Sequence, residues 1–133
     1  MGIGSLIFKS ASRVLLIEDD LDTAALTTHW LRGCGFATEF AETRNLALEH
    51  LKNHRFLFIL MDYQMPGMSA EEFVPLIRKR YPRSILILTS GESVYEAASN
   101  LGISYVLQKP YYDEDLTSMI KRIIEVKGIP EAV

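Results

Sequence analysis

The chain has 133 residues, of which 48% are hydrophobic and 23% are charged, and its formal net charge is -3. This size fits one domain, and this composition is that of a globular protein rather than a disordered or membrane chain. The negative charge gives no general attraction for nucleic acid, and a single cysteine excludes an internal disulfide. We therefore expect a reduced, cytoplasmic protein that does not bind nucleic acid directly.

The two ends of the chain are expected to flank the domain. Residues 1–12 contain an apolar patch without a preceding positive charge, so they lack the order of a secretory signal. No apolar run reaches the roughly 18 residues that a membrane span requires. We therefore predict a leader over 1–12, one domain over 13–128, a tail over 129–133 and no membrane association.

Short apolar runs alternate with longer amphipathic stretches, a pattern typical of repeated strand-helix units. Three runs are continuously apolar, as in parallel strands covered by helices on both faces, and two contain polar residues, as at sheet edges. In chain order the predicted strands are 14–17, 36–40, 56–61, 85–88 and 103–107, with the second and fifth at the edges.

The intervening stretches are predicted to be helices. The clearest is the last, where apolar residues recur at three- and four-residue steps between Asp113, the expected N-cap, and Gly128, the expected stop. The four earlier helices are predicted over roughly 21–33, 43–53, 69–81 and 92–101.

This pattern predicts an α/β fold with a single doubly wound, five-stranded parallel sheet. Central first, third and fourth strands match the order 2-1-3-4-5, and right-handed crossovers place helices on both faces. In such sheets, ligands bind beyond the carboxyl ends of the strands, near the point where the strand order reverses. Functional residues are therefore expected at that edge.

Polar side chains follow four of the predicted strands at their carboxyl ends. In chain order they are Glu18, Asp19, Asp20, Asp62, Thr89, Ser90 and Lys109. Neighbouring carboxylates repel by about 4 kcal/mol per pair at about 4 Å when the effective dielectric constant is near 20. A divalent cation would remove this repulsion, and an all-oxygen ligand set suits Mg²⁺. Asp20 and Ser90 are the least specific members, because an acid caps helices and a serine ends strands in many folds.

Four segments that carry these residues resemble one known family. RVLLIEDD, LMDYQMPGM, ILTS and LQKP, in this order and each at the expected strand, resemble the receiver domain of bacterial response regulators. The resemblance covers roughly Arg13 to Lys127. It implies the flavodoxin-like receiver fold, as in chemotaxis regulators, and a phosphoacceptor switch in a two-component phosphorelay.

The resemblance also implies a role for each residue. Asp62 would accept a phosphoryl group from the phosphohistidine of a sensor histidine kinase or a phosphotransfer protein, while Thr89 and Lys109 would contact phosphoryl oxygens. The expected Mg²⁺ ligands are Glu18 (through water), Asp19, Asp62 and the backbone carbonyl of Gln64. The domain would be regulatory rather than an enzyme, and a downstream protein would bind the face of the fourth helix, fifth strand and fifth helix.

The segment around Lys109 departs from the family pattern at one position. Val106 lies three residues before Lys109, where the family usually has an aromatic residue, and Tyr105 is expected on the opposite strand face. The usual aromatic route from Thr89 to the output surface is therefore in doubt. The Lys109–Pro110 bond is expected to be cis, and the two tyrosines that follow it are expected to be exposed.

Three alternatives share parts of this pattern. The chain could be the receiver module of a hybrid kinase or larger regulator, or a pseudo-receiver that binds partners without accepting phosphate. The complete set of acceptor, acidic and lysine residues argues against the pseudo-receiver. A phosphatase with an aspartyl-phosphate intermediate would need a second acid two residues after its nucleophile, where Gln64 stands.

Overall fold

The computed structural model describes residues 12–129, so the predicted leader before Ser12 and the predicted tail after Ile129 lie outside the described residues. Strands and helices alternate along the chain as predicted. They are β1 (Arg13–Ile17), α1 (Leu21–Gly33), β2 (Ala37–Ala41), α2 (Arg44–Asn53), β3 (Phe58–Asp62), α3 (Ala70–Arg80), β4 (Ile85–Ser90), α4 (Tyr95–Asn100), β5 (Tyr105–Gln108) and α5 (Asp113–Lys127).

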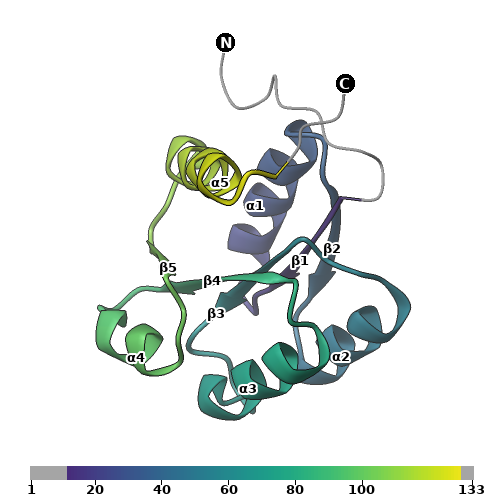
Figure 1. Cartoon of the computed structure of the whole chain (residues 1–133), viewed down its shortest axis with the longest axis vertical. Helices are drawn as coiled ribbons and strands as arrows, with labels where there is room; N and C mark the ends of the chain where they lie inside the picture. Colours follow the sequence, from purple (N-terminus) through teal and green to yellow (C-terminus); the bar gives the residue numbers. More distant parts are fainter. Residues whose placement is uncertain (1–11, 130–133) are drawn as a thin grey trace.

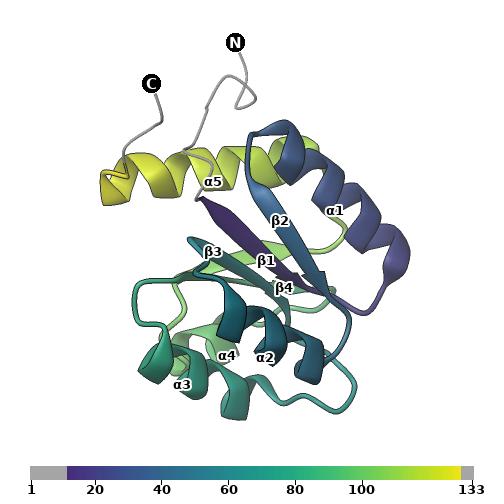
Figure 2. The same ribbon diagram turned by 90° about the vertical axis from the view of Figure 1, so that its right-hand side faces the viewer.

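The five strands form one parallel sheet in the order β2-β1-β3-β4-β5, which confirms the predicted topology. Helices α1 and α5 cover one face, and α2, α3 and α4 cover the other (Figure 1). The view turned by 90° shows the same three layers (Figure 2). The carboxyl ends of all five strands therefore lie at one edge of the sheet.

Strand β3 shows why this sequence forms a central strand. All five of its residues are buried, and successive side chains point to opposite faces of the sheet. Phe58 and Leu60 pack in the core beneath α1 and α5, whereas Ile59 and Met61 pack in the core beneath α2, α3 and α4. A continuously apolar run is needed because both faces are covered by helices.

The predicted helices lie close to the observed ones, and the starts of α4 and α5 show how the ends are set. Helix α5 has Tyr112 rather than Asp113 as its N-cap, and the backbone N–H of Tyr112 donates to the Asp115 carboxylate at 2.8 Å. Helix α4 begins at Tyr95, later than predicted, because the Ser90 hydroxyl accepts from the N–H of Glu92 and holds a turn there. Within residues 12–129, no helix is both long and apolar enough to cross a membrane.

Strand β5 confirms the predicted placement of Tyr105 and Val106 on opposite faces. Tyr105 packs against the core beneath α1 and α5, and Val106 packs against the core beneath α2, α3 and α4. In the pairing with β4, Thr89 lies opposite Leu107 and Leu88 lies opposite Val106. The face of β5 beside α4 therefore carries a short branched side chain rather than an aromatic ring.

Candidate functional site

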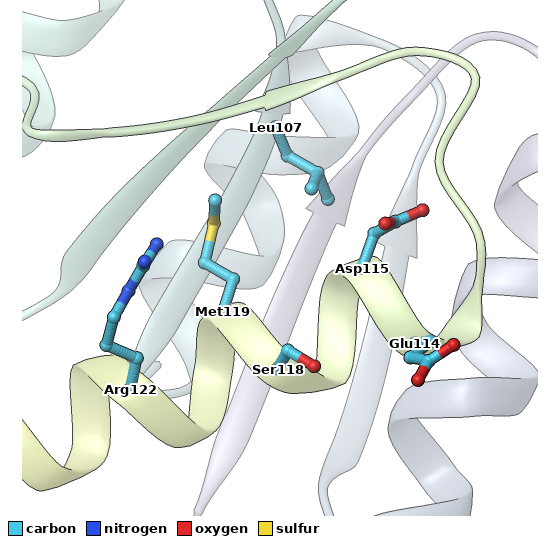
Figure 3. A pocket seen from close by; sticks show the side chains of 6 residues that line it. All are labelled: Leu107, Glu114, Asp115, Ser118, Met119 and Arg122. Atoms are coloured by element: carbon cyan, nitrogen blue, oxygen red, sulfur yellow. The ribbon is translucent and has the colours of Figure 1, made fainter.

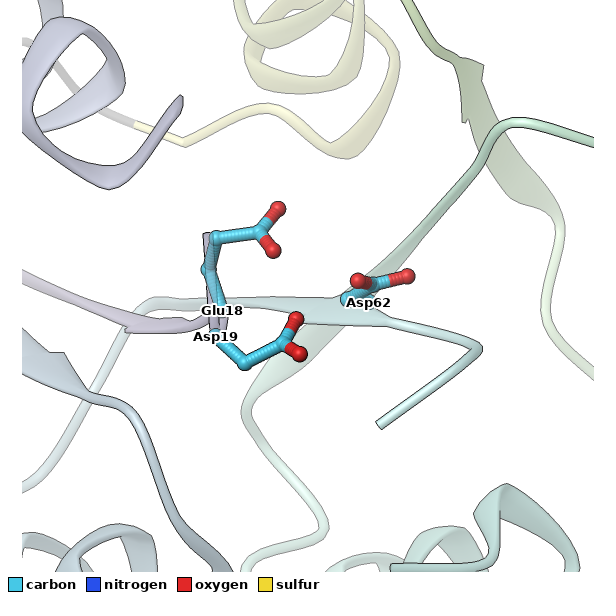
Figure 4. A group of neighbouring side chains, drawn as sticks. All are labelled: Glu18, Asp19 and Asp62. Atoms are coloured by element: carbon cyan, nitrogen blue, oxygen red, sulfur yellow. The ribbon is translucent and has the colours of Figure 1, made fainter. Parts of the chain in front are cut away.

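Three carboxylates meet at the carboxyl ends of β1 and β3. Oxygen atoms of Glu18, Asp19 and Asp62, one from each residue, all lie within 4.8 Å of one another (Figure 4). Glu18 and Asp62 are buried, and Asp19 is exposed. The parallel pairing of β1 with β3 brings these residues together, because the strands run side by side and end at the same edge.

Glu18 is an almost fully buried carboxylate, with an exposed fraction of 1%. Its backbone N–H donates to the carbonyl of Ala41 at 3.0 Å, and its Oε2 accepts from the N–H of Asp20 at 3.1 Å. Burial raises the pKa of Glu18, although the nearby lysine opposes this shift. A charge at this position therefore needs a cation close by.

Lys109 supplies that cation. Its Nζ lies 2.5 Å from Oε1 of Glu18 and 3.1 Å from Oδ2 of Asp62. The contact with Asp62 is a hydrogen bond, whereas Oε1 of Glu18 has an ion pair but no well-aligned hydrogen bond. Burial alone would lower the pKa of Lys109, but the two carboxylates outweigh burial and raise it. The lysine is therefore charged when both carboxylates are.

Asp62 is held in place at both of its oxygens. Oδ2 accepts from Lys109, and Oδ1 accepts from the backbone N–H of Gln64 at 3.1 Å. The latter bond closes a tight turn directly after β3. The turn leaves Gln64 exposed and keeps it next to Asp62. The backbone carbonyl of Gln64 is the group that was expected to bind metal.

Thr89 lies opposite Asp62 in the pairing of β3 with β4. It is 2% exposed, and its hydroxyl donates to the carbonyl of Met61 over 3.5 Å, at the outer limit of a hydrogen bond. Such a weak bond can be exchanged for a stronger one at little cost. Ser90 is buried, and its hydroxyl holds the turn before α4, as expected of a structural residue.

Asp20 stands apart from the cluster as the N-cap of α1. Its carboxylate accepts hydrogen bonds from both the backbone N–H and the hydroxyl of Thr23. These bonds lower the pKa of Asp20. The capping role considered for this residue from the sequence accounts for its position.

The loop after β5 agrees with the sequence analysis except at Tyr111. The Lys109–Pro110 bond is cis, as the family resemblance implied. Tyr112 is exposed as expected, but the expectation was wrong for Tyr111, which is 7% exposed. The Tyr111 hydroxyl lies 2.7 Å from that of Thr27, and its ring packs edge-on against Trp30. The partners of Tyr111 come from α1, so no local sequence signal marks its burial.

A cavity of about 460 Å³ opens between this loop and the start of α1. Gly91 and Lys109 both line it, beside apolar side chains such as Leu26. A Cβ added at Gly91 would have no atom within 4 Å. The cavity therefore leaves open space beside Gly91 and Lys109.

The site residues fit a hard divalent cation. Three carboxylates lie opposite one ammonium group, so a fully ionised cluster carries an excess of negative charge. Exposed Asp19 is open to solvent, and the neighbouring oxygens are of the type that Mg²⁺ prefers. The buried Oε1 of Glu18, which lacks a well-aligned hydrogen bond, could accept one from a metal-bound water.

The sequence model of the response regulator receiver domain matches residues 14–121. The chain is 31% identical over 121 residues to the transcriptional regulatory protein CpxR homolog of Haemophilus influenzae, covering 90% of this chain and 53% of the relative. It is also 30% identical to the aerobic respiration control sensor protein ArcB of Escherichia coli, covering 92% of this chain and 16% of that protein. The chain thus spans about half or less of these relatives.

Solved structures give the same result. A response regulator receiver domain protein (CheY-like) from Methanospirillum hungatei has a TM-score of 0.80 at 26% identity, covering 90% of this chain and 98% of the other. Chemotaxis protein CheY4 of Vibrio cholerae has a TM-score of 0.78 at 26% identity, covering 84% and 98%. The fold and the family match define a receiver domain of two-component systems. The chain belongs to the response regulator receiver domain family.

The ion pairs of Lys109 predict a loss of stability when it is removed. We expect Lys109→Met to lower the free energy of unfolding by about 3 kcal/mol without metal, because the substitution leaves a buried charge unpaired. Urea unfolding with a chelator present measures this loss. The double variant Glu18→Gln/Lys109→Met should recover most of it, and an equal loss in both variants would contradict the role of the pair.

Proposed function

We propose that this chain is a signalling switch in which Asp62 accepts a phosphoryl group from a phosphohistidine. The position of Asp62 carries the proposal: its carboxylate is fixed at a strand end, 3.1 Å from an ammonium group and beside two further carboxylates. The reaction needs alignment and charge neutralisation more than acid-base catalysis. The domain would therefore be regulatory, promoting only its own phosphorylation and dephosphorylation.

In this reaction an oxygen of Asp62 forms a bond to phosphorus. The phosphorus–nitrogen bond of the donor breaks, and its electron pair returns to the imidazole. Lys109 compensates part of the negative charge on the phosphoryl oxygens, and its hydrogen bond to Asp62 supports this role. The product is an acyl phosphate, which water can later hydrolyse.

We propose Mg²⁺ as the cofactor, bound by Asp19, Asp62 and the backbone carbonyl of Gln64 directly, and by Glu18 through water. When bound, Mg²⁺ neutralises charge on the carboxylates and on the transferred group. The structure supports these ligands by the proximity of the three carboxylates and by the turn that keeps Gln64 next to Asp62.

Thr89 would report phosphorylation to the rest of the domain. Its hydroxyl can exchange the weak bond to Met61 for a charge-assisted bond to a phosphoryl oxygen. Val106 has no ring that could move between two pockets, so we propose that the signal passes through displacement of residues 89–95 and α4. Helix α4 is short and has no side-chain N-cap bond, which favours such movement.

The proposed donor is a sensor histidine kinase or phosphotransfer protein, and the proposed target is a protein that binds the face of α4, β5 and α5. A pocket of about 340 Å³ between β5 and α5 lies on this face (Figure 3). Its lining residues are Leu107, Glu114, Asp115, Ser118, Met119 and Arg122. The mixture of both charges with apolar groups suits a protein partner. The cytoplasmic location inferred from the single cysteine is part of this proposal.

A second candidate is the same switch as a module of a larger protein, with the domain over 13–128. The ArcB relative supports it, since the matched region is 16% of that sensor protein. In either case the chemistry at Asp62 is the same.

Phosphorylation should be lost when Asp62 is replaced. We expect wild-type protein to gain one phosphoryl group from a small amido- or acyl-phosphate with Mg²⁺, and Asp62→Asn to gain none, because an amide cannot form the acyl phosphate. Intact mass measurement checks this. Asp20→Asn is the matched control, since asparagine also caps helices and Asp20 lies outside the cluster. Labelling of Asp62→Asn at the wild-type rate would refute the assignment.

Magnesium binding should depend on Asp19 and not on Asp20. We expect Mg²⁺ to raise the melting temperature of the wild type, because it binds the folded state. Asp19→Asn should weaken Mg²⁺ affinity by about tenfold or more, since one charged ligand of a hard cation is lost. Thermal unfolding across a Mg²⁺ titration measures both effects. A larger loss of Mg²⁺ affinity in Asp20→Asn than in Asp19→Asn would show that the metal site lies elsewhere.

Gly91 should influence the lifetime of the phosphoryl group. A Gly91→Leu side chain would enter the cavity beside Lys109, where we expect it to hinder water and slow dephosphorylation by about tenfold. Gly33→Leu is the matched control, because a Cβ there also meets no atom within 4 Å. Decay of the phosphorylated mass gives the rates. Equal rates in wild type and Gly91→Leu would show that water arrives by another path.

A further inference from the structure

A second concave site lies at the amino-terminal edge of the sheet, away from Asp62. It is a cavity of about 680 Å³ lined by residues 51–56 and 80–84, which we call the basic cleft. The cleft lies where α2 and α3 end, and these helices are neighbours on one face of the sheet (Figure 2). Pairing of Phe58 with Ile85 and a 2.7 Å bond from the Ser84 hydroxyl to the Phe56 carbonyl hold its two halves together.

The lining of the basic cleft carries only one sign of charge. Lys52, Arg55, Arg80 and Arg83 all line it, together with His54, and no Asp or Glu does. The whole chain has 17 acidic and 14 basic residues, so this local excess opposes the net charge of -3. All four Lys and Arg side chains are exposed, and none forms an ion pair with a described residue.

Helix stabilisation accounts for only part of this charge. Lys52 and Arg80 lie in the last turns of α2 and α3, where cations interact favourably with the helix dipole. Arg55 and Arg83 lie beyond those helices, in the loops that lead into β3 and β4. Stabilisation of the helix dipole therefore does not explain why Arg55 and Arg83 line the same cavity.

We propose that the basic cleft binds an acidic segment of a protein. Four unpaired cations would attract its carboxylates, and complementary charge of this kind favours association and specificity. Pro82 is exposed and Tyr81 is partly exposed, and they add an apolar part to the lining that an apolar side chain of such a segment could contact. A free inorganic anion would leave this apolar part unused.

The aromatic side chains favour a protein segment over single-stranded nucleic acid. Binding of single strands relies on exposed aromatic rings on which bases stack. In the basic cleft, Phe56 is 5% exposed and Tyr81 is partly buried, so the cleft offers no fully exposed aromatic ring. The cleft and Asp62 are separated by the length of β3, roughly 15 Å at about 3.3 Å per residue. The acidic segment can therefore bind while the phosphoacceptor edge stays open.

Titration of the ¹⁵N-labelled chain with a short peptide of Glu and Leu residues tests this proposal. We expect amide shifts concentrated in 51–56 and 80–84, and an affinity that falls as salt rises from about 0.05 M to about 0.5 M. The same peptide with Gln in place of Glu should not bind. A single-stranded oligonucleotide of equal charge is the third probe.

Charge reversal in the cleft separates a specific site from general attraction. Arg55→Glu/Arg83→Glu should weaken peptide binding by about tenfold or more, because two attractions become repulsions. Arg44→Glu/Lys121→Glu changes the net charge equally at exposed positions outside the cleft and should change affinity by less than about twofold. The neutral variant Arg55→Gln/Arg83→Gln should fall between them, and thermal unfolding shows that each variant is folded.

Three results would overturn the proposal. Absence of peptide binding to the wild type would do so, as would equal losses in the cleft and control variants. Tighter binding of the oligonucleotide than of the peptide, with shifts at the same residues, would assign the cleft to nucleic acid instead. None of these results depends on phosphorylation of Asp62. Failure of the cleft proposal can therefore be distinguished from failure of the proposed function.

Discussion

The ammonium group of Lys109 between Glu18 and Asp62 is the interaction on which the arrangement of the site depends. A carboxylate as buried as Glu18 is unstable as an ion unless a cation lies close to it. Lys109 reaches it from the end of β5, although β4 and β3 separate β5 from β1 in the sheet. The ion pairs thus connect residues from three strands, and they fix Asp62 with its carboxylate already oriented.

This arrangement also supports the proposed role of the site as a switch. The metal-free cluster has one cation opposite three carboxylates, so its charge is only partly balanced. In the proposed function, joining a phosphoryl group to Asp62 would change the partners available to Lys109 and would offer Thr89 a stronger acceptor than the Met61 carbonyl. Because Thr89 belongs to β4, its new bond would act on the loop that leads to α4. A rearrangement of backbone, rather than of an aromatic side chain, is consistent with Val106 in β5.

The sequence predicted the strand order and the gathering of acidic residues at one edge of the sheet because both depend on local patterns. Continuously apolar strands must be covered on both faces, and polar residues at the ends of parallel strands must share one edge. Features that rest on contacts between distant segments could not be predicted in this way. The hydroxyls of Thr27 and Tyr111 are 84 residues apart in the chain, so the burial of Tyr111 follows only from packing of α1 against the loop after β5. The basic cleft likewise exists only because β3 pairs with β4.

A high-resolution structure with Mg²⁺ and beryllium fluoride, which mimics a phosphoryl group, tests the central claim most directly. The account predicts the mimic on an Asp62 oxygen, Mg²⁺ bound to Asp19, Asp62 and the Gln64 carbonyl, and the ammonium of Lys109 in contact with the mimic. A mimic bound to another carboxylate, or a Lys109 that keeps its present contacts while Asp62 carries the mimic, would contradict it.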